Sequence, residues 1–590
     1  MSGIRRTLAA ITACGLFIGG GAHADTEHDT DSHDGAGLRM HAHERVEWRD
    51  AHAANPHAWV RFQILGFNDF HGQLTAGRRV ANRPVGSAPV LAAYLEAAQE
   101  EVDDDATFIV HAGDHVGATP PVSALLQDEP SISFLNLLAN DKCTYRNPRH
   151  PKCNLVGTLG NHEFDDGIAE IRRLLAGGNH ANGPFLEHPY RGARFPYVSA
   201  NVVDAASGAP ILPPYVIKRV RGLPVAFIGA VLKETPTVVT PTGVAGVRFL
   251  DEAEAVNRYV PELKARGVRA IVVLIHQGAR TGTFTGPTRS DPVTLPGAIG
   301  DIVRRLDDEI DVVVSGHAHS FTNALVENAN GKPILVTQAF ANGTAYADID
   351  LALDPASRDI VEKSAAIVTT WADEGPGLAP DEDVAELVAA AEARVAPLVN
   401  RIVGTAAGMI ARDQNSAGES ALGNLIADAQ RAAMASDFAF MNSGGIRADI
   451  DAGDVTWGEL FSVQPFGNDL VRMDLSGAQI VRLLNQQWAG QPYPRILQVS
   501  GLSYTWDDAR AIGDRVVDVR DGAGNALDPA AIYSVTVNSF IAAGGDNFST
   551  LTQGANRIVG PVDLDALVDY IASLPQPFTA AITGRIQRLN

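Results

Sequence analysis

The stretch VRFQILGFNDFHG, residues 60–72, decides the fold class of this chain. Its first half is rich in β-forming and apolar residues, which predicts a buried strand. Asp69 and His71 follow that run two residues apart, so an extended or turning strand end can aim both side chains at one point. Carboxylates and imidazoles both bind divalent metal ions. The stretch therefore predicts metal ligands at the end of a buried strand.

The alternation of short β-rich runs with helical segments continues to about residue 370. Buried strands are predicted at 107–111, 225–231, 270–275, 312–315 and 334–336, and helices at 88–99 and 301–306. This alternation predicts an α/β domain. A break containing Gly and Pro precedes a helical pattern at 381–398. With 590 residues, the chain is long enough for a second domain.

Five segments concentrate residue types that bind metals, at 68–72, 113–117, 160–165, 276–278 and 316–319. Two divalent cations roughly 3.5–4 Å apart need mixed nitrogen and oxygen ligands and one shared carboxylate. Asp114 suits the shared position because glycines lie close to it on both sides. Singly, each motif has a structural explanation, since a loop histidine is usually a surface residue. Five in this order favour a metal site. The candidate ligands are Asp69, His71, Asp114, Asn161, His276, His317 and His319.

The order of these motifs resembles the calcineurin-like metallophosphoesterases, and NDFHG at 68–72 with GNHEFD at 160–165 resembles their 5'-nucleotidase branch. The resemblance implies an α/β fold, a four-layer αββα sandwich followed by a separate α+β substrate-binding domain. It also implies in-line attack on phosphorus by a water or hydroxide held between two metals. Zinc, manganese and cobalt all suit such mixed ligands. The implied ligand sets are Asp69, His71, Asp114 and His319 for one ion, and Asp114, Asn161, His276 and His317 for the other.

Two side chains of the GNHEFD motif remain after the ligands are assigned. The family uses the pair corresponding to His162 and Asp165 in catalysis, where a protonated imidazole stabilises the transition state or assists the leaving oxygen. The alternative is a purely structural role for His162 beside the metals. His115 is either a residue that supports its neighbour Asp114 or an exposed one.

The second domain carries candidate substrate-binding residues. Gly444 and Gly445 let backbone amides approach an anion, and Arg447 adds a guanidinium that can donate two N–H groups to it. Phe466 and Phe540 are either core residues or a pair that sandwiches a base. By resemblance to the 5'-nucleotidase C-terminal domain, the two aromatics stack on the base. The remaining implied contacts are Asn442 to the base, Asp546 to the ribose, and Arg412 and Arg447 to phosphate. One departure is Ser416, where some relatives carry a further arginine.

Residues 1–24 have the charged start, apolar run and Ala22-His23-Ala24 ending of a signal peptide. We therefore expect a periplasmic or secreted protein with no later membrane span. In an oxidising compartment, Cys143 and Cys153 are expected to form a disulfide. It closes a basic insertion at 141–154 that either borders the substrate cleft or is ornamental. The predicted division is 1–24 signal peptide, 25–57 histidine-rich segment, 58–370 metallophosphoesterase domain, 371–400 linker with a helix, and 401–590 C-terminal domain.

The formal net charge of −22 argues against nucleic-acid polymers as partners and favours a small-molecule nucleotide. The leading hypothesis is an exported phosphohydrolase that cleaves nucleoside 5'-monophosphates, with nucleotide sugars or 2',3'-cyclic nucleotides as further substrates. One alternative is a thiosulfohydrolase of the same architecture. Another is a non-catalytic periplasmic nucleotide-binding protein. The oligomeric state is not predicted.

Overall fold

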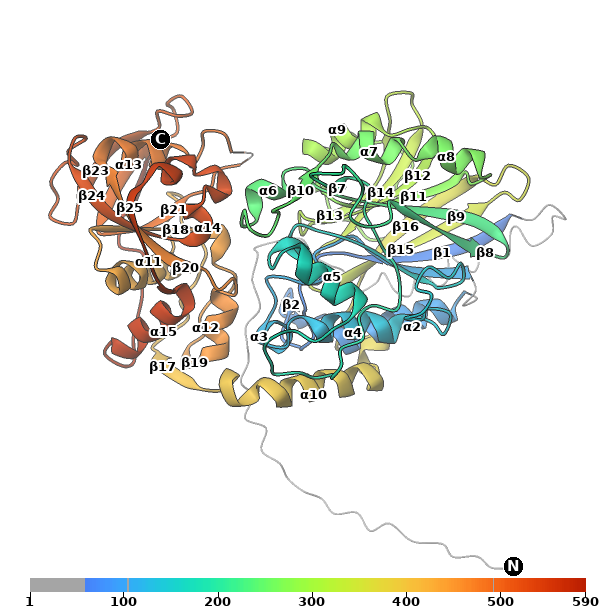
Figure 1. Cartoon of the computed structure of the whole chain (residues 1–590), viewed down its shortest axis with the longest axis horizontal. Coiled ribbons are helices and arrows are strands. Elements are labelled where there is room, and N and C mark those ends of the chain that lie inside the picture. The colour runs from blue at the N-terminus through green and yellow to red at the C-terminus, as the bar shows by residue number, and fades with distance from the viewer. Residues whose placement is uncertain (1–58, 103–105, 492) are drawn as a thin grey trace, which may run out of the picture.

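A computed structural model describes residues 59–102, 106–491 and 493–590 (Figure 1). The predicted signal peptide and the histidine-rich segment lie outside the described residues. In Figure 1 the described chain forms two bodies, joined by the helix α10 (Glu382–Val399). Within the described ranges, no helix is both long and apolar enough to cross a bilayer.

Two six-stranded sheets form the centre of the first domain. In each sheet, four neighbouring strands pair in parallel, and antiparallel strands complete the sheet. The first sheet has the order β16 (Ile360–Thr369), β15 (Ala345–Leu353), β1 (Val60–Phe67), β4 (Thr107–His111), β5 (Leu155–Thr158), β6 (Tyr197–Val198). The second has the order β13 (Phe321–Glu327), β14 (Pro333–Ala339), β12 (Ile310–Ser315), β11 (Ala270–His276), β9 (Leu223–Val231), β8 (Tyr215–Val220).

Side-chain alternation explains why both faces of each sheet are buried. In β1, Ile64 joins the core between the two sheets, whereas its neighbour Leu65 joins the core under the helices. In β11, Leu274 faces the other sheet and Ile275 faces the opposite helix layer. The helices on the two outer faces include α2 (Ala88–Glu100), α4 (Glu129–Leu138) and α5 (Ile168–Ala176), and α7 (Glu252–Asn257), α8 (Val260–Ala265) and α9 (Gly297–Arg305). The expected four-layer sandwich is confirmed.

The helix α10 belongs to the packing of the first domain. The Asp381 carboxylate accepts the Val384 N–H at 2.6 Å and so caps its start. Its buried side chains Val388 and Val395 lie in the same core as α2 and α4. At its other end, Val399 lies so close to Gly458 that a Cβ there would come within 2.4 Å of the valine side chain. The helix therefore connects the first domain directly to α12 (Trp457–Val463).

The second domain is built on a five-stranded mixed sheet with helices on both sides. The helix α11 (Ala421–Met434) starts at Ser420, whose hydroxyl accepts the Gly423 N–H. It packs against α15 (Asp563–Ser573), and α13 (Gly477–Asn485) covers the other face. The sheet order is β21 (Leu497–Ser500), β18 (Phe438–Asn442), β24 (Ile532–Asn538), β20 (Asp469–Ser476), β25 (Ala555–Val562).

Candidate active site

The predicted metal ligands converge at the carboxyl ends of β1, β4, β5, β11 and β12. Parallel strands end at a common edge. The ends of β1 and β12 also lie close together, since a Cβ added at Gly66 would be only 3.0 Å from the Val314 side chain. Most ligands lie in turns with left-handed backbone, at φ 50° for Asp69 and 49° for Asp114. Such conformations cost roughly 1–3 kcal/mol each and persist only where the surroundings impose them. His71, His317 and His319 share this conformation.

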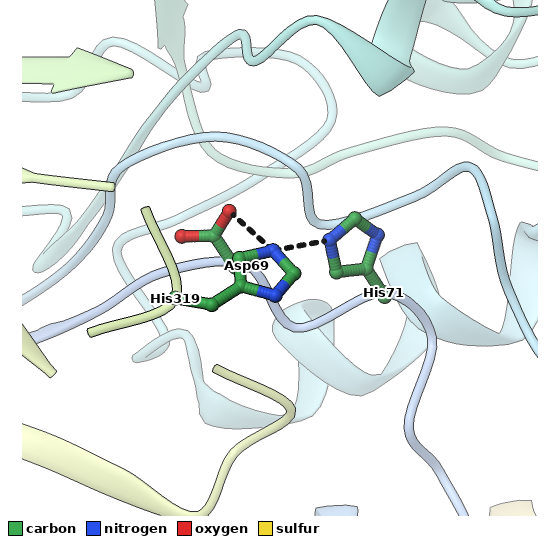
Figure 2. A group of neighbouring side chains, drawn as sticks. All are labelled: Asp69, His71 and His319. Carbon is green, nitrogen blue, oxygen red and sulfur yellow. Dashed lines mark hydrogen bonds and ion pairs between the residues drawn. The ribbon is translucent and has the colours of Figure 1, made fainter. Parts of the chain in front are cut away.

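Six of the seven predicted ligands form two groups of three, each with its ligand atoms within 4.8 Å of one another. Asp69, His71 and His319 make the first group (Figure 2). His319 Nε2 lies 3.2 Å from Asp69 Oδ1 and 3.2 Å from His71 Nε2. The second group consists of Asp114, His276 and His317.

Asp114 lies between the two groups. Its Oδ2 is 2.9 Å from His276 Nε2 in its own group and 3.8 Å from His71 Nε2 in the other. This is the position that the sequence assigned to a shared carboxylate. Two glycines make room for it, because a Cβ at Gly160 would lie 2.1 Å from Asp114 Oδ1 and one at Gly113 would lie 2.5 Å from the Gly160 nitrogen.

Backbone carbonyls orient two of the imidazoles. His71 Nδ1 donates to the Gly117 carbonyl at 2.9 Å, and His276 Nδ1 donates to the Ala112 carbonyl at 2.8 Å. Each bond places the proton on Nδ1 and leaves Nε2 as the ligand nitrogen, as is usual for histidines that bind metals.

The protonation states of Asp69, His71 and His317 suit cations, whereas that of His276 does not. Burial alone raises the pKa of Asp69, but His319 and His276 lower it to about 2. Burial lowers the pKa of His71 to about 3 despite the nearby Asp114, and that of His317 to about 4. Burial also acts to lower the pKa of His276, but Asp114 and Asp69 raise it to about 10. A cation must therefore displace a proton from His276.

The donor set fits divalent metal ions. It is buried, combines imidazole nitrogens with carboxylate oxygens, and includes Asn161, whose Oδ1 is buried and has no hydrogen-bond partner among the described residues. A buried amide oxygen without a partner is costly, so a ligand is expected there.

Two residues that the sequence gave no role hold the ligands in place. Asn68 Nδ2 donates to Asp69 Oδ2 at 2.6 Å, and its Oδ1 accepts the Ala339 N–H. Glu163 accepts backbone N–H groups of Asp114 and Gly160 at 2.9 and 2.5 Å, and also that of His115. Burial, followed by the charge of Asp114, raises the pKa of Glu163 to about 7. Asn68 belongs to the NDFHG motif and Glu163 to the GNHEFD motif, and this membership is the signal that could have identified them.

His162 and Asp165 form a pair beside the metal ligands. His162 Nδ1 and Asp165 Oδ2 are 2.7 Å apart, and the His162 backbone N–H donates to Asp114 Oδ1 at 2.8 Å. Burial acts to lower the pKa of His162, but Asp165 and Asp114 raise it above its ordinary value. His115, by contrast, is fully buried and stacks on Phe70 with ring centroids 5.0 Å apart, so it supports the fold and is not exposed.

One group of candidate residues in the second domain lies around Asp546. Asn442 Nδ2 donates to Asp546 Oδ2 at 3.0 Å, and a Cβ at Gly444 would lie 3.9 Å from the same oxygen. The Phe540 ring packs against Gly545, where a Cβ would come within 2.5 Å of it. The structure adds Arg495, whose Nη1 is 2.9 Å from Asp546 Oδ1. No motif in the sequence signals this arginine.

A second group faces the first domain. The Phe466 ring stacks on the His162 ring, with centroids 5.9 Å apart and planes 16° from parallel. Arg447 Cζ lies 5.9 Å from the centre of the same phenylalanine ring. Arg412 is placed by its backbone N–H, which donates to Asp449 Oδ1 at 2.6 Å. Phe466 and Phe540 are half-buried, so neither is a simple core residue.

Comparisons with known proteins agree with this architecture. The model of the calcineurin-like phosphoesterase family matches residues 62–321, and that of the 5'-nucleotidase C-terminal domain matches residues 402–553. A cell wall protein of Listeria monocytogenes is 36% identical over 549 residues, which cover 87% of this chain and 67% of that protein. An endonuclease of Bacillus subtilis is 37% identical over 544 residues, which cover 90% of this chain and only 41% of that protein.

A crystal structure of a 5'-nucleotidase precursor from Thermus thermophilus superposes with a TM-score of 0.72 at 29% identity, covering 90% of this chain and 99% of that one. The fold and the paired ligand groups define a metal-dependent phosphoesterase. More narrowly, the chain belongs to the 5'-nucleotidase family, in which a calcineurin-like phosphoesterase domain precedes a 5'-nucleotidase C-terminal domain.

Proposed function

We propose that this protein hydrolyses nucleoside 5'-monophosphates to nucleoside and phosphate. The observation that carries the proposal is the stacking of Phe466 on His162, which joins the candidate nucleoside site to the candidate catalytic pair. A nucleotide has its base and its phosphate at opposite ends. A base site in one domain and a phosphate-cleaving site in the other therefore match such a substrate.

Seven side chains hold the two metals in this proposal. Asp69, His71 and His319 hold one, Asn161, His276 and His317 hold the other, and Asp114 contributes to both. Two divalent cations bound by these residues would lower the pKa of a water molecule toward neutrality and would offset the negative charge that develops on the phosphoryl oxygens.

The catalytic pair handles the proton. Asp165 accepts the Nδ1–H of His162, which leaves Nε2 to donate to the leaving oxygen of the substrate. The raised pKa of His162 favours the protonated form that this role requires. Phe466 covers one face of the imidazole.

The second domain binds the nucleoside. In the proposal, Phe466 and Phe540 stack on the base, Asn442 contacts it, and Asp546 accepts hydrogen bonds from the ribose. The glycines 444 and 445 leave room for the substrate to approach the backbone. Arg412 and Arg447 carry the positive charge that an acidic protein needs near phosphate.

The domain limits and the location are also proposals. We place the first domain at 58–370, the linker at 371–400 and the second domain at 401–590. Export to the periplasm or the medium is supported by the bonded Cys143–Cys153 pair, because disulfides persist in oxidising compartments. The resemblance to a Listeria cell wall protein points the same way.

Substrate turnover tests the proposal. Phosphate release should be measured from AMP, UDP-glucose, 2',3'-cyclic AMP and p-nitrophenyl phosphate, with and without chelator. We expect AMP to be cleaved with the highest kcat/KM and chelator to abolish turnover. A chain that cleaves p-nitrophenyl phosphate but no nucleotide contradicts the proposal. Cleavage of a thiosulfonate instead of AMP would establish the thiosulfohydrolase alternative.

A further inference from the structure

The carboxylate of Asp546 is held from both sides. Asn442 donates to its Oδ2 at 3.0 Å, and Asn538 Nδ2 in turn donates to Asn442 Oδ1 at 2.9 Å. On the other side, Arg495 Nη1 approaches Asp546 Oδ1 to 2.9 Å. Both side chains of this ion pair are largely buried, at 12% and 13% exposed. A buried pair of this kind is stable only when its geometry is good and its remaining groups find partners.

Arg495 has hydrogen-bonding capacity left over. Its Nη1 is buried and makes no aligned hydrogen bond with any described residue, although it lies at ion-pair distance from Asp546. A buried donor without an acceptor is costly, so such an atom beside a candidate ligand site marks a place for a ligand oxygen. The guanidinium presents several N–H groups in a fixed plane and can bond the carboxylate and a ligand together.

The backbone around this pair is held in place. Asp546 has left-handed backbone, at φ 54°, and its carbonyl accepts Gln491 Nε2 at 2.6 Å. The Arg495 backbone N–H donates to the Gln487 carbonyl at 2.9 Å. Both residues are therefore fixed relative to each other before any ligand binds, which is the condition for geometric selectivity.

We propose that Arg495 is a specificity-determining residue that acts with Asp546 on the vicinal hydroxyls of a ribose, so that the enzyme prefers ribonucleotides to 2'-deoxyribonucleotides. Asp546 accepts hydrogen bonds from the hydroxyls, and the buried Nη1 of Arg495 donates to a hydroxyl oxygen. This inference rests on the proposed function. Burial raises the pKa of Asp546, and the charge of Arg495 and the hydrogen bond from Asn442 act against that rise.

The preference for a ribonucleotide follows from the polar groups of Asp546 and Arg495 that a deoxyribose leaves unpaired. A 2'-deoxyribonucleotide leaves part of this buried polar pair without a partner, and sites built to bond a hydroxyl reject analogues that lack it. We expect wild-type kcat/KM to be about 10- to 100-fold higher for AMP than for dAMP. The substitution Arg495→Met keeps the aliphatic stem and removes the donor. It should reduce that ratio to below about threefold, mainly through KM for AMP.

The test is steady-state kinetics on AMP, dAMP and p-nitrophenyl phosphate, with Arg495→Met, Arg495→Lys and a control. The control is Arg515→Met, because Arg515 pairs with Asp508 at 2.9 Å and is 18% exposed in the same domain. We expect Arg495→Lys to recover part of the AMP preference, and Arg515→Met to keep all of it. Turnover of p-nitrophenyl phosphate, which has no ribose, should stay within about twofold in every variant.

Each outcome decides something. An unchanged AMP to dAMP ratio in Arg495→Met overturns the inference while the proposed function stands. An equal loss on p-nitrophenyl phosphate also overturns it, because it shows a structural role for Arg495. If the wild type cleaves p-nitrophenyl phosphate but not AMP, the proposed function itself fails.

Discussion

The candidate metal centre and the proposed nucleoside site are built in different ways. The carboxylates of the metal centre, Asp69 and Asp114, are at most 1% exposed and lie at strand ends between two packed sheets. The aromatic residues of the nucleoside site, Phe466 and Phe540, are half-buried and lie on loops or at short helical turns. In this proposal, the packed sheets carry the groups that fix the chemistry, and the loops and short turns carry those that select the substrate.

The largest effect is expected from the shared carboxylate. The substitution Asp114→Asn should lower kcat for every phosphate ester by about 10³-fold or more, because both ligand groups lose a charge at once. Kinetics and metal analysis of the purified variant measure this. The control is Asp311→Asn, a buried aspartate of the same domain that pairs with Lys332 and Lys363. It should lose stability but keep kcat within a few-fold.

Removal of the candidate acid should have a smaller effect. The substitution His162→Asn should lower kcat by about 10²- to 10⁴-fold while two metal equivalents are retained, because His162 assists the leaving group and binds no metal in this account. Substitution of His150, a half-buried histidine in the disulfide-closed insertion, should change neither quantity. A His162→Asn variant with full activity means that the pair is structural.

A change in the nucleoside site should act on binding. The substitution Phe540→Ala should raise KM for AMP about tenfold or more, because one stacking surface is lost, and should leave p-nitrophenyl phosphate unaffected. Phe461→Ala is a matched control, since this half-buried phenylalanine packs on Trp457 in the same domain. Equal losses on AMP in both variants would indicate general destabilisation.

The smallest effect on activity is expected from the disulfide. Both cysteines are buried in the core of the first domain, and the bond closes a loop with a sequence separation of 10. The double substitution Cys143→Ser and Cys153→Ser should lower the free energy of unfolding by about 2–4 kcal/mol. Urea denaturation measures this loss, and kcat at low temperature should not change. A large drop in kcat would place the insertion at the substrate site.

The first domain could be predicted because its metal-binding motifs directly follow apolar runs that are typical of buried strands. The run at 60–66 became β1 (Val60–Phe67), and that at 334–336 became the longer β14 (Pro333–Ala339). The antiparallel strands β15 and β16 at one side of the first sheet were not predicted, and the partner that joins β15 to the sheet, β1, lies far away along the chain. β1 pairs with β15 at residues such as Val60 and Leu353. Long-range pairing leaves no local pattern to detect.

The candidate site was predicted where a residue belonged to a dense motif. Asp114 and His276 come together as expected, at 2.9 Å. Asn68 and Glu163 lie in the same motifs but received no role, because motif membership does not show which backbone and side-chain groups they bond. Arg495 lies in a loop without any motif and reaches Asp546 only in the folded chain.

The central claim is that two divalent cations bind at this centre and that both are needed for hydrolysis. Metal-free protein should be titrated with manganese, zinc or cobalt while bound metal and AMP hydrolysis are followed together. The account predicts two equivalents per chain and activity that appears only as the second binds. Full activity with a single equivalent, or in excess chelator, contradicts it.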